Sequence, residues 1–292
     1  MDFYFASVRL SITSAFDDIV FVSFTSKNFT TPLTPPTHFF VGEMGWMHDK
    51  LLEKFQLVFT GKAFGDIELP YEWRIHQCES DVAIEIIFEE HPFLKRSVAL
   101  ISSTKGTVNI YLEPKASTPL PIRIDPMEHP LSSLLLGYLA YLSGGFLVHA
   151  SGVEDEGKGY LFTAVSGTGK STMAGLWQKT GATIINDDRL WLLPVNGEWY
   201  MFNTPMVWYA EEPRMAPLDG IYLLRQSPNN QIKQITGITA SMRFMSNCIQ
   251  HFYDEKMTAS HLDRVLALTN QTPIFDLGFK PDHEVVELLR KK

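Results

Sequence analysis

The residues with the clearest chemical potential form one short run, Ser-Gly-Thr-Gly-Lys-Ser-Thr, at positions 166–172. An apolar strand is expected to lead into this run, and a helix is expected to begin at Lys170. Glycines let the backbone curl so that several N–H groups point at one anion, and the helix N-terminus adds its positive dipole end. Lys170 can reach the outer phosphates of a nucleotide, and the Ser171 hydroxyl can ligate the Mg²⁺ that bridges them. The run therefore predicts a phosphate-binding loop (P-loop) for a nucleoside triphosphate, formed by Ser166, Gly167, Thr168, Gly169, Lys170, Ser171 and Thr172.

One element of the usual pattern, G-x-x-x-x-G-K-[ST], is missing, because Ala164 stands where its first glycine belongs. The alternative interpretation is a glycine-rich turn between a strand and a helix that binds nothing. The expected strand before the run and the expected helix after it are the context that a phosphate site requires, so they favour the phosphate site.

Two adjacent acidic residues, Asp187 and Asp188, follow the next apolar strand. In enzymes with such a loop, an acidic residue at a strand end holds Mg²⁺ or its water shell. A pair of carboxylates offers a division of labour, in which one orients the metal and the other accepts the proton of an attacking hydroxyl as a general base. The competing interpretation is a plain Asx turn, which the Asp-Asp-Arg sequence would also form.

His149 lies near the end of the strand expected before the loop strand. A lone histidine on a strand is more often structural. Its position beside the loop strand could nevertheless bring it near the γ-phosphate or the metal, so His149 joins Asp187 and Asp188 as a candidate catalytic residue.

The elements that must position these residues alternate between strand and helix patterns. Residues 146–153 and 159–165 predict two strands joined by a hairpin tip, residues 170–179 predict a helix, and residues 182–186 predict a buried strand. This half of the chain therefore has an α/β pattern, and the candidate residues lie at the ends of its strands.

Residues 1–125 have a different pattern, with recurring strand-like runs bounded by turn residues, such as 81–88 and 107–112. A proline-rich connection follows. The sequence therefore predicts two parts: a β-rich N-terminal region at 1–125 and a nucleotide-binding domain at 126–292.

Composition narrows the classes of partner. The formal net charge of −8 argues against a general nucleic-acid binder, because such affinity rests on cationic contacts. Cys78 and Cys248 lie far apart, so neither a disulfide framework nor a zinc cluster is expected, and a reducing cytoplasm is the simplest location. The N-terminus shows no signal-peptide pattern.

Residues 131–150 contain no Asp, Glu, Lys or Arg, which raises the question of a membrane span. Gly144 and Gly145 divide the stretch, however, and its first part has the apolar spacing of a buried helix. A core helix followed by a core strand is the expectation.

Two further patterns do not indicate a function. The helical stripe Ile238, Met242, Met245, Ile249 and Phe252 is expected to pack in the core. The run at 261–264, His-Leu-Asp-Arg, superficially echoes a protein-kinase catalytic loop, but its companion motifs are absent, so it is expected on a helix surface.

Three motifs, at 149–153, 166–172 and 185–189, occur in the order and spacing of a known family. Together they resemble the kinase core of HPr kinase/phosphorylase-related proteins, a core similar to the nucleotide-binding domain of ATP-dependent phosphoenolpyruvate carboxykinase. The close match covers about residues 146–190, and a looser match extends to the C-terminus. The N-terminal part resembles that of HPr kinase-related proteins found beside peptide-modification genes.

The resemblance implies an α/β fold with a mixed sheet and a phosphoenolpyruvate carboxykinase-like P-loop core, joined to a β-rich region suited to recognising a substrate or partner. It implies phosphoryl transfer from ATP, with Mg²⁺, to a hydroxyl such as that of serine. By motif position, Asp188 would be the base and Asp187 the metal partner beside Ser171, and His149 would contact metal or phosphate. A homo-oligomer is also compatible with it.

The chain departs from this family in the stretch at 203–208, which replaces a Glu/Arg/Gly-rich segment of true HPr kinases, so HPr itself is not the expected acceptor. It also lacks room for carboxykinase substrate machinery. An arginine is expected to neutralise charge in the transition state, and Arg189, Arg214 and Arg225 remain open candidates.

Two other functions remain open. The chain could be a non-catalytic nucleotide-binding or peptide-recognition module, an idea to which Ala164 gives weight. It could also be a nucleotide-hydrolysing switch, although the guanine-reading N-K-x-D stretch is absent. The acceptor, whether peptide, protein or small molecule, cannot be read from the sequence.

Overall fold

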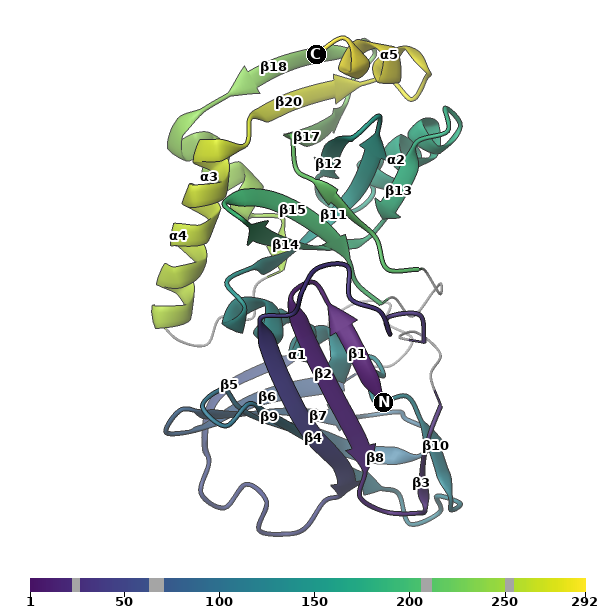
Figure 1. Ribbon diagram of the computed structural model, residues 1–292, viewed down its shortest axis with the longest axis vertical. Coiled ribbons are helices and arrows are strands. Elements are labelled where there is room, and N and C mark those ends of the chain that lie inside the picture. Colours follow the sequence, from purple (N-terminus) through teal and green to yellow (C-terminus); the bar gives the residue numbers. More distant parts are fainter. Residues whose placement is uncertain (23–26, 63–70, 206–211, 250–254) are drawn as a thin grey trace. The chain divides into compact units, whose positions relative to one another are not determined.

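The computed structural model describes residues 1–22, 27–62, 71–205, 212–249 and 255–292 (Figure 1). The chain forms two compact units. The first comprises Met1–Ser143 and Pro205–Glu212, and the second comprises Gly144–Thr204 and Pro213–Lys292.

The first unit is built on an eight-stranded sheet with the strand order β1-β2-β4-β9-β8-β7-β6-β5 (Figure 1). Strand β2 pairs parallel with β4, and β4 pairs parallel with β9, whereas the other neighbours are antiparallel. Its strands are β1 (Asp2–Phe5), β2 (Val8–Ser14), β4 (His38–Trp46), β5 (Gln56–Lys62), β6 (Tyr71–Cys78), β7 (Asp81–Phe88), β8 (Leu94–Ser102) and β9 (Thr107–Pro114).

Alternating burial explains why these segments form a sheet with a covered face. In β2, Val8, Leu10 and Ile12 are buried, while the residues between them are partly exposed. Helix α1 (Leu131–Leu142) packs against β7 and β8. Two short strands, β3 (Ile19–Phe21) and β10 (Ile122–Ile124), form a separate parallel pair.

The boundary expected between residues 125 and 126 lies before α1, whereas the structure groups α1 with the first unit, whose main segment ends at Ser143. The physical reason is the apolar face of α1, whose Leu135 and Leu139 are fully buried. The glycines after α1, rather than the prolines before it, thus mark the division.

The second unit is built on a ten-stranded mixed sheet, so the fold is mixed α/β. The main strand order is β16-β15-β14-β11-β12-β17-β20-β18, and β13 and β19 pair with β11 off this path. Its strands are β11 (Phe146–Asp155), β12 (Lys158–Thr163), β13 (Thr183–Asn186), β14 (Arg189–Val195), β15 (Glu198–Asn203), β16 (Met215–Pro217), β17 (Gly220–Gln226), β18 (Gln231–Ile235), β19 (Cys248–Ile249) and β20 (Ile274–Phe279).

Strands β12, β17 and β20 run parallel to one another, so their carboxyl ends share one edge of the sheet. Strand β13 points the same way, because it and β12 are both antiparallel to β11. We refer to this edge as the carboxyl edge. Open α/β sheets bind ligands in the crevice outside such an edge.

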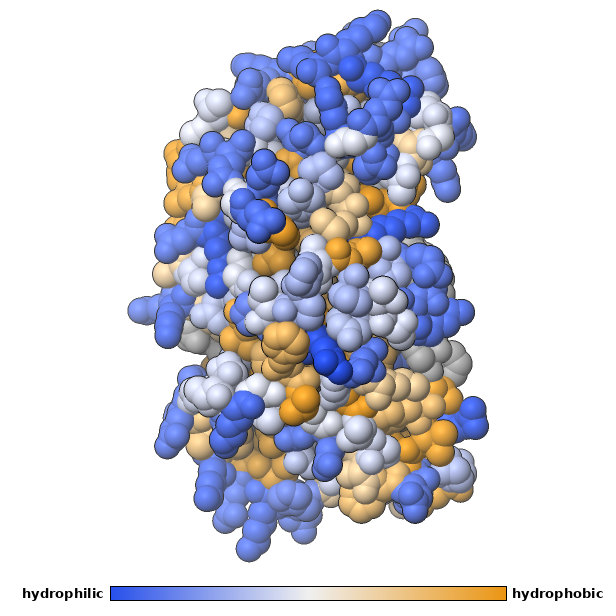
Figure 2. All heavy atoms as spheres, viewed as in Figure 1, coloured by the Kyte–Doolittle hydropathy of each residue, from blue (hydrophilic) through white to orange (hydrophobic). Residues whose placement is uncertain are grey.

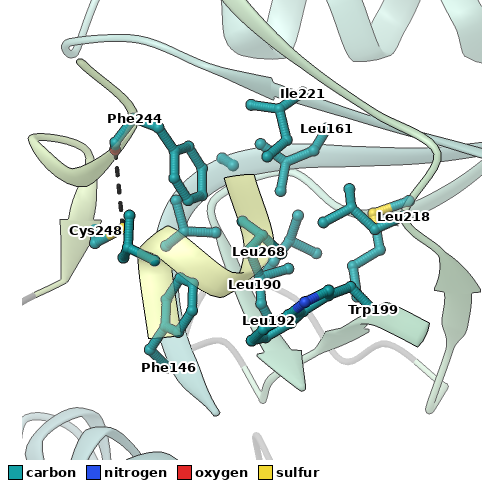
Figure 3. Packing of buried hydrophobic residues seen from close by; sticks show 14 of the residues in the cluster. Phe146, Leu161, Leu190, Leu192, Trp199, Leu218, Ile221, Phe244, Cys248 and Leu268 are labelled. Atoms are coloured by element: carbon teal, nitrogen blue, oxygen red, sulfur yellow. Dashed lines mark hydrogen bonds between the residues drawn. The ribbon is translucent and has the colours of Figure 1, made fainter. Parts of the chain in front are cut away.

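Two apolar cores cover the two faces of this sheet. One includes Phe146, Leu161, Ile221 and Phe244, which point toward one another in Figure 3. The other includes Phe162, Trp177, Tyr222 and Phe275 and contains several ring contacts.

The helices of the second unit are α2 (Lys170–Gln178), α3 (Gly237–Met245), α4 (Glu255–Gln271) and α5 (Glu284–Arg290). The first core contains Ala240 and Phe244 of α3 together with Val265 and Leu268 of α4, and α2 and α5 contribute Trp177 and Val285 to the second. Trp177, at 0% exposure, anchors α2 and therefore fixes the end of the preceding loop.

The predicted core stripe from Ile238 to Phe252 is wrong in part. Helix α3 ends at Met245, Ile249 belongs to β19, and Ile238 and Met242 are exposed. The helix instead buries Ala240, Ser241 and Phe244, a face rotated away from the larger side chains. Phe252 lies outside the described residues.

The expectation that 261–264 form a helix surface is wrong for His261. This residue is buried in α4, with its ring edge-on to the ring of Phe146. Histidine is a polar residue type, so nothing in the sequence indicated that His261 would pack against the apolar ring of Phe146.

In the described part of the chain, none of the helices combines the length and apolar character needed to cross a bilayer. On the face drawn in Figure 2, hydrophobic residues that reach the surface occur in groups between hydrophilic ones.

Candidate functional site

The run at 166–172 forms a turn followed by the first residues of α2, at the carboxyl end of β12. Gly167 and Gly169 have φ angles of 78° and 119°, which L side chains rarely adopt, so glycine is required at both. Thr168 closes the turn by donating its N–H and its hydroxyl to the Val165 carbonyl. We call residues 164–169 the glycine loop.

Ala164 is not among the described residues with positive φ. The backbone at this position is therefore compatible with a side chain, which explains how alanine replaces the first glycine of the pattern. The missing glycine is thus no obstacle to the loop conformation.

Lys170 opens α2 and is 7% exposed, and its Nζ donates to the Ala164 carbonyl at 3.1 Å. Burial lowers the pKa of its ammonium, and the nearby charges of Asp188 and Asp187 partly oppose that shift. An ammonium has three N–H donors. Because the ammonium contacts the far end of the loop at Ala164, it is well placed to bind an anion held by the loop.

The first turn of α2 adds backbone donors to the same place. Its N-cap residue, Gly169, makes no side-chain capping hydrogen bond. The N–H groups of a helix's first turn have no partner inside the helix, and they carry the positive end of its dipole. Ser171 and Thr172, in this turn, are exposed, as is Ser166 in the loop.

Strand β11 brings the acidic pair to the glycine loop. On one side Ala150 pairs with Thr163, the last residue of β12. On the other side Gly152 pairs with Asn186 and His149 pairs with Arg189, so the residues between, Asp187 and Asp188, run alongside Ser151 and Ala150. The Ala150 N–H donates to the Asp188 carbonyl at 3.0 Å.

The turn at the acidic pair is made by Asn186, not by an aspartate. The fully buried Asn186 accepts the N–H groups of Asp188 and Arg189 with Oδ1, at 2.9 and 3.1 Å. The Asx turn that Asp-Asp-Arg could form thus exists, but it begins one residue earlier. Because Asn186 supplies the turn, both carboxylates are left for other contacts.

Asp188 lies beside His149, with 3.3 Å between its Oδ1 and the histidine Nε2. That hydrogen bond is the largest influence on the Asp188 carboxyl and lowers its pKa, whereas burial opposes the shift. The charges of Arg189 and Lys170 lower it further. Asp188 is therefore an ionised hydrogen-bond acceptor at neutral pH.

Asp187 is held by a different residue. The buried Ser151 hydroxyl donates to Asp187 Oδ1 at 2.5 Å. Thr163 similarly anchors the main chain at His149 by donating its hydroxyl to that carbonyl at 2.7 Å. These two hydrogen bonds hold the backbone at His149 and the side chain of Asp187 in place.

A cavity of about 560 Å³ adjoins the glycine loop at the carboxyl edge. It is lined by Gly167, Thr168, Gly169, Thr172, Gln226, Ser227, Pro228, Phe279 and Pro281. A volume of this size suits a small ligand or cofactor. Phe279 lies so close to Gly169 that a Cβ there would be 2.7 Å from its ring, so glycine also keeps this wall of the cavity in place.

The three arginine candidates occupy different places. Arg189 is next to the acidic pair and lowers the pKa of Asp188. Arg214 donates to the Ile184 carbonyl, and Arg225 pairs with Asp276 at 2.8 Å. Of the three, Arg189 is the one with an electrostatic effect on the candidate site.

The donor set fits magnesium and a phosphate chain. Mg²⁺ prefers oxygen ligands and usually keeps several waters, needing one or two carboxylates besides phosphates. The Ser171 hydroxyl and the Asp187 carboxylate supply such oxygens, and Lys170 supplies a buried cation for the phosphates. Within the described residues, no cluster of three or more His, Cys, Asp or Glu forms a ready cation site.

Several residues of this region were missed by sequence reasoning. Asn186 carried a usable signal, because Asn is a strong turn former directly after a strand. Ser151, Gln226 and Phe279 carried none, since they become neighbours only through strand pairing. The stretch at 203–208 is described only as far as 205, so its predicted departure from the kinase pattern at 206–208 lies outside the described residues.

Comparisons with known proteins do not show a family for this chain. No family model matches the chain, and no curated protein matches it. Among solved structures, the chain is similar to the HPr(Ser) kinase/phosphatase from Coxiella burnetii, at 12% identity and a TM-score of 0.30, over 50% of this chain and 91% of that one. The candidate site therefore rests on the geometry of this chain alone.

Proposed function

We propose that the second unit binds a nucleoside triphosphate with Mg²⁺ and transfers its γ-phosphoryl group to a hydroxyl. The observation that supports this most is that a buried lysine contacts a glycine loop that lines a cavity and also feels the charges of an acidic pair. The charges of Asp187 and Asp188 act on Lys170, so the three groups are electrostatic neighbours.

In the proposed complex, the phosphate chain lies along the glycine loop and the N-terminus of α2. The nucleoside then extends into the cavity, where the ring of Phe279 and the polar ends of Gln226 and Ser227 are available to it. Lys170 exchanges some of its contact with the Ala164 carbonyl for phosphate oxygens.

The acidic pair would divide the chemistry. The acceptor oxygen forms a bond to the γ-phosphorus while the bond from that phosphorus to the β,γ-bridging oxygen breaks, and the nucleoside diphosphate leaves. The proton of the acceptor hydroxyl passes to Asp188. Phosphoryl transfer is mostly positioning and charge stabilisation, so an ionised carboxylate that orients the hydroxyl is sufficient even with a low pKa.

His149 would hold Asp188 in its orientation through the 3.3 Å contact. Ser171 and Asp187 would hold Mg²⁺, which when bound neutralises charge on the β- and γ-phosphate oxygens. Ser151 fixes Asp187 from the neighbouring strand.

A binding module without catalysis is the second candidate. Ala164 was the feature that favoured it, and the backbone at that position is compatible with alanine. The pairing of His149 with Asp188 is not needed for nucleotide binding alone, so transfer is the better-supported function.

The test is transfer from γ-labelled ATP, with Mg²⁺, to free serine, free threonine and a pool of serine-containing peptides. The full chain is expected to label at least one acceptor. Asp188→Asn is expected to lose the label while it still binds nucleotide. Asp263→Asn, which changes an exposed carboxylate of α4, is the matched control and is expected to label normally.

Nucleotide binding without labelling of any acceptor would favour the binding module. Unchanged labelling by Asp188→Asn would remove Asp188 from the mechanism.

A further inference from the structure

Helix α3 presents two large apolar side chains to solvent. Ile238 and Met242 are 64% and 51% exposed and lie one helical turn apart, on the same side of α3. Single exposed apolar residues are ordinary, so this pair alone does not indicate a partner.

A cationic cluster includes Arg243, which follows Met242 directly in α3. Arg225 of β17 and Arg243 of α3 each contact one oxygen of Asp276 at 2.8 Å. Lys233 of β18 lies directly opposite Asp276 in the strand pairing. Two guanidiniums thus hold one carboxylate between them, and Lys233 is its cross-strand neighbour, in a chain whose net charge is −8.

Asp276 holds both guanidiniums in place while leaving most of their donors free to reach a ligand. Each guanidinium has five N–H donors, and these contacts use one nitrogen of each. Burial raises the pKa of Asp276, but the hydrogen bonds from Arg243 and Arg225 outweigh it, so the carboxylate stays charged. Arg225 also lies against the backbone of Gly278, where a Cβ would be 2.8 Å from its Cζ.

Fixed guanidiniums bind carboxylates at lower entropic cost than free ones, and bidentate pairing adds specificity. The two arginines are therefore a prepared site for carboxylates, and Ile238 and Met242 add an apolar contact at its side. We call these six residues the α3 surface: Arg225, Lys233, Ile238, Met242, Arg243 and Asp276.

We propose that the α3 surface binds an acidic polypeptide segment, whose carboxylates pair with Arg225 and Arg243 and whose apolar side chains cover Ile238 and Met242. A short segment fits better than an extended polyanion, because the negative charge of the rest of the chain repels a long one. Nucleic-acid phosphates would also leave the apolar pair uncovered.

This surface is separate from the nucleotide cavity. Successive side chains of a strand point to opposite faces, so Gln226 lines the cavity while Arg225 lies on the other face of the sheet. The proposal therefore does not depend on phosphoryl transfer.

The test is fluorescence anisotropy of the full chain with a labelled synthetic peptide that carries leucines at helical spacing and glutamates elsewhere. Two comparison peptides replace its glutamates by lysine or its leucines by serine. The glutamate–leucine peptide is expected to bind at low ionic strength and more weakly as salt rises. Both comparison peptides are expected to bind at least about tenfold more weakly.

Two variants locate the binding. Arg225→Gln with Arg243→Gln is expected to weaken binding about tenfold or more. Ile238→Ser with Met242→Ser, at exposed positions where folding is not at risk, is expected to weaken it about fivefold. The matched control, Lys50→Gln with Lys54→Gln, removes two exposed lysines of the first unit and is expected to stay within about twofold.

The proposal is overturned if the glutamate–leucine peptide does not bind, or if the lysine control weakens it as much as the arginine variant does. A further arm uses vesicles of phosphatidylserine and phosphatidylcholine. Vesicle binding that requires Arg225 and Arg243, without peptide binding, would assign the surface to a membrane instead and so also overturn it.

Discussion

Two of the histidine–carboxylate pairs among the described residues lie in opposite settings. In the first unit, His76 Nε2 lies 2.9 Å from Glu85 Oε2, and the Glu85 side chain is 2% exposed. In the second unit, His149 Nε2 lies 3.3 Å from Asp188 Oδ1, and the Asp188 side chain is 36% exposed. The carboxylate is buried in the first pair and partly exposed to solvent in the second.

The partners around the two pairs differ as well. The second oxygen of Glu85 accepts a hydrogen bond from Arg96, which in turn donates to Glu113. Both oxygens of Glu85 therefore have protein partners, and we call this network closed. Burial raises the pKa of Glu85, but the bonds from His76 and Arg96 outweigh it and hold the pKa below its usual value. Asp188 instead adjoins Lys170, whose ammonium is directed at a loop carbonyl beside a cavity.

The comparison teaches that a histidine–carboxylate pair is not by itself a catalytic sign. A closed network of charges stabilises one arrangement of strands, whereas an open pair with a nearby cation can bind something. The first pair thus suits a role in folding, whereas the proposed function uses the second, and the following predictions separate the two roles.

The largest expected effect is on catalysis. Asp188→Asn is expected to lower the rate of phosphoryl transfer by about a thousandfold, because the neutral amide cannot take the acceptor proton. Glu85→Gln is expected to leave the rate unchanged in the same assay. Equal losses in the two variants would show that the pairs do not differ in function.

The next largest effect is on stability, where Glu85→Gln is expected to have a larger effect than Asp188→Asn. Glu85→Gln is expected to lower the free energy of unfolding by about 2 kcal/mol, because it replaces the buried carboxylate that bonds to His76 and Arg96 with a neutral amide. Asp188→Asn is expected to change it by less than about 1 kcal/mol, since its pair is solvent-screened. Urea unfolding followed by circular dichroism measures both, and a larger loss for Asp188→Asn would reverse the assignment.

The sequence predicts the open site better than the closed one. The loop residues at 166–172, the helix from Lys170 and the strand ending at Asn186 follow from local patterns, and the structure has all three elements. The pairing of His76 with Glu85 could not be predicted, because it depends on the register between β6 and β7. Local motifs are visible in a sequence, whereas cross-strand charge networks are not.

The wrong prediction for α3 and the unpredicted strand order of the first unit also arise because packing between distant segments is not visible in local sequence patterns. The spacing of Ile238 and Met242 suits a buried helical face, but α3 packs with its smaller residues inward. The parallel pairing of β2 with β4 and of β4 with β9 has no local signal either. The strand-rich composition of the first part was readable, and its strand order was not.

His261 extends the comparison to a buried histidine whose nearby charge is an arginine, Arg264. Burial lowers the pKa of His261 from 6.5 to about 4, with the charge of Arg264 adding to the shift. Between these values the unfolded chain binds more protons than the folded one, so stability falls as the pH drops from 6.5 toward 4. The cost at the acid end is about 3 kcal/mol.

His261→Leu is expected to remove this part of the pH dependence, as measured by unfolding from pH 6.5 down to 4. His283→Gln, which changes an exposed histidine of the same unit, is the control and is expected to keep it. An unchanged slope in His261→Leu would mean that His261 does not take up a proton on unfolding.

The smallest expected effects concern the glycine loop, where the proposed nucleotide would bind. Gly167→Ala places a side chain at a φ of 78° and is expected to weaken nucleotide binding about tenfold. Ala164→Gly is expected to change it by less than about threefold, because the backbone there is already compatible with either residue. Titration with a fluorescent ATP analogue distinguishes them, and the reverse order would contradict the loop geometry.

The most direct test of the central claim is calorimetric titration of the full chain with ATP and Mg²⁺, compared with Lys170→Ala. We predict a saturable heat for the natural chain and at least about a hundredfold weaker binding for the variant, because the variant lacks the buried cation proposed to contact the phosphates. No heat from the natural chain, or equal affinity in the two proteins, would contradict it.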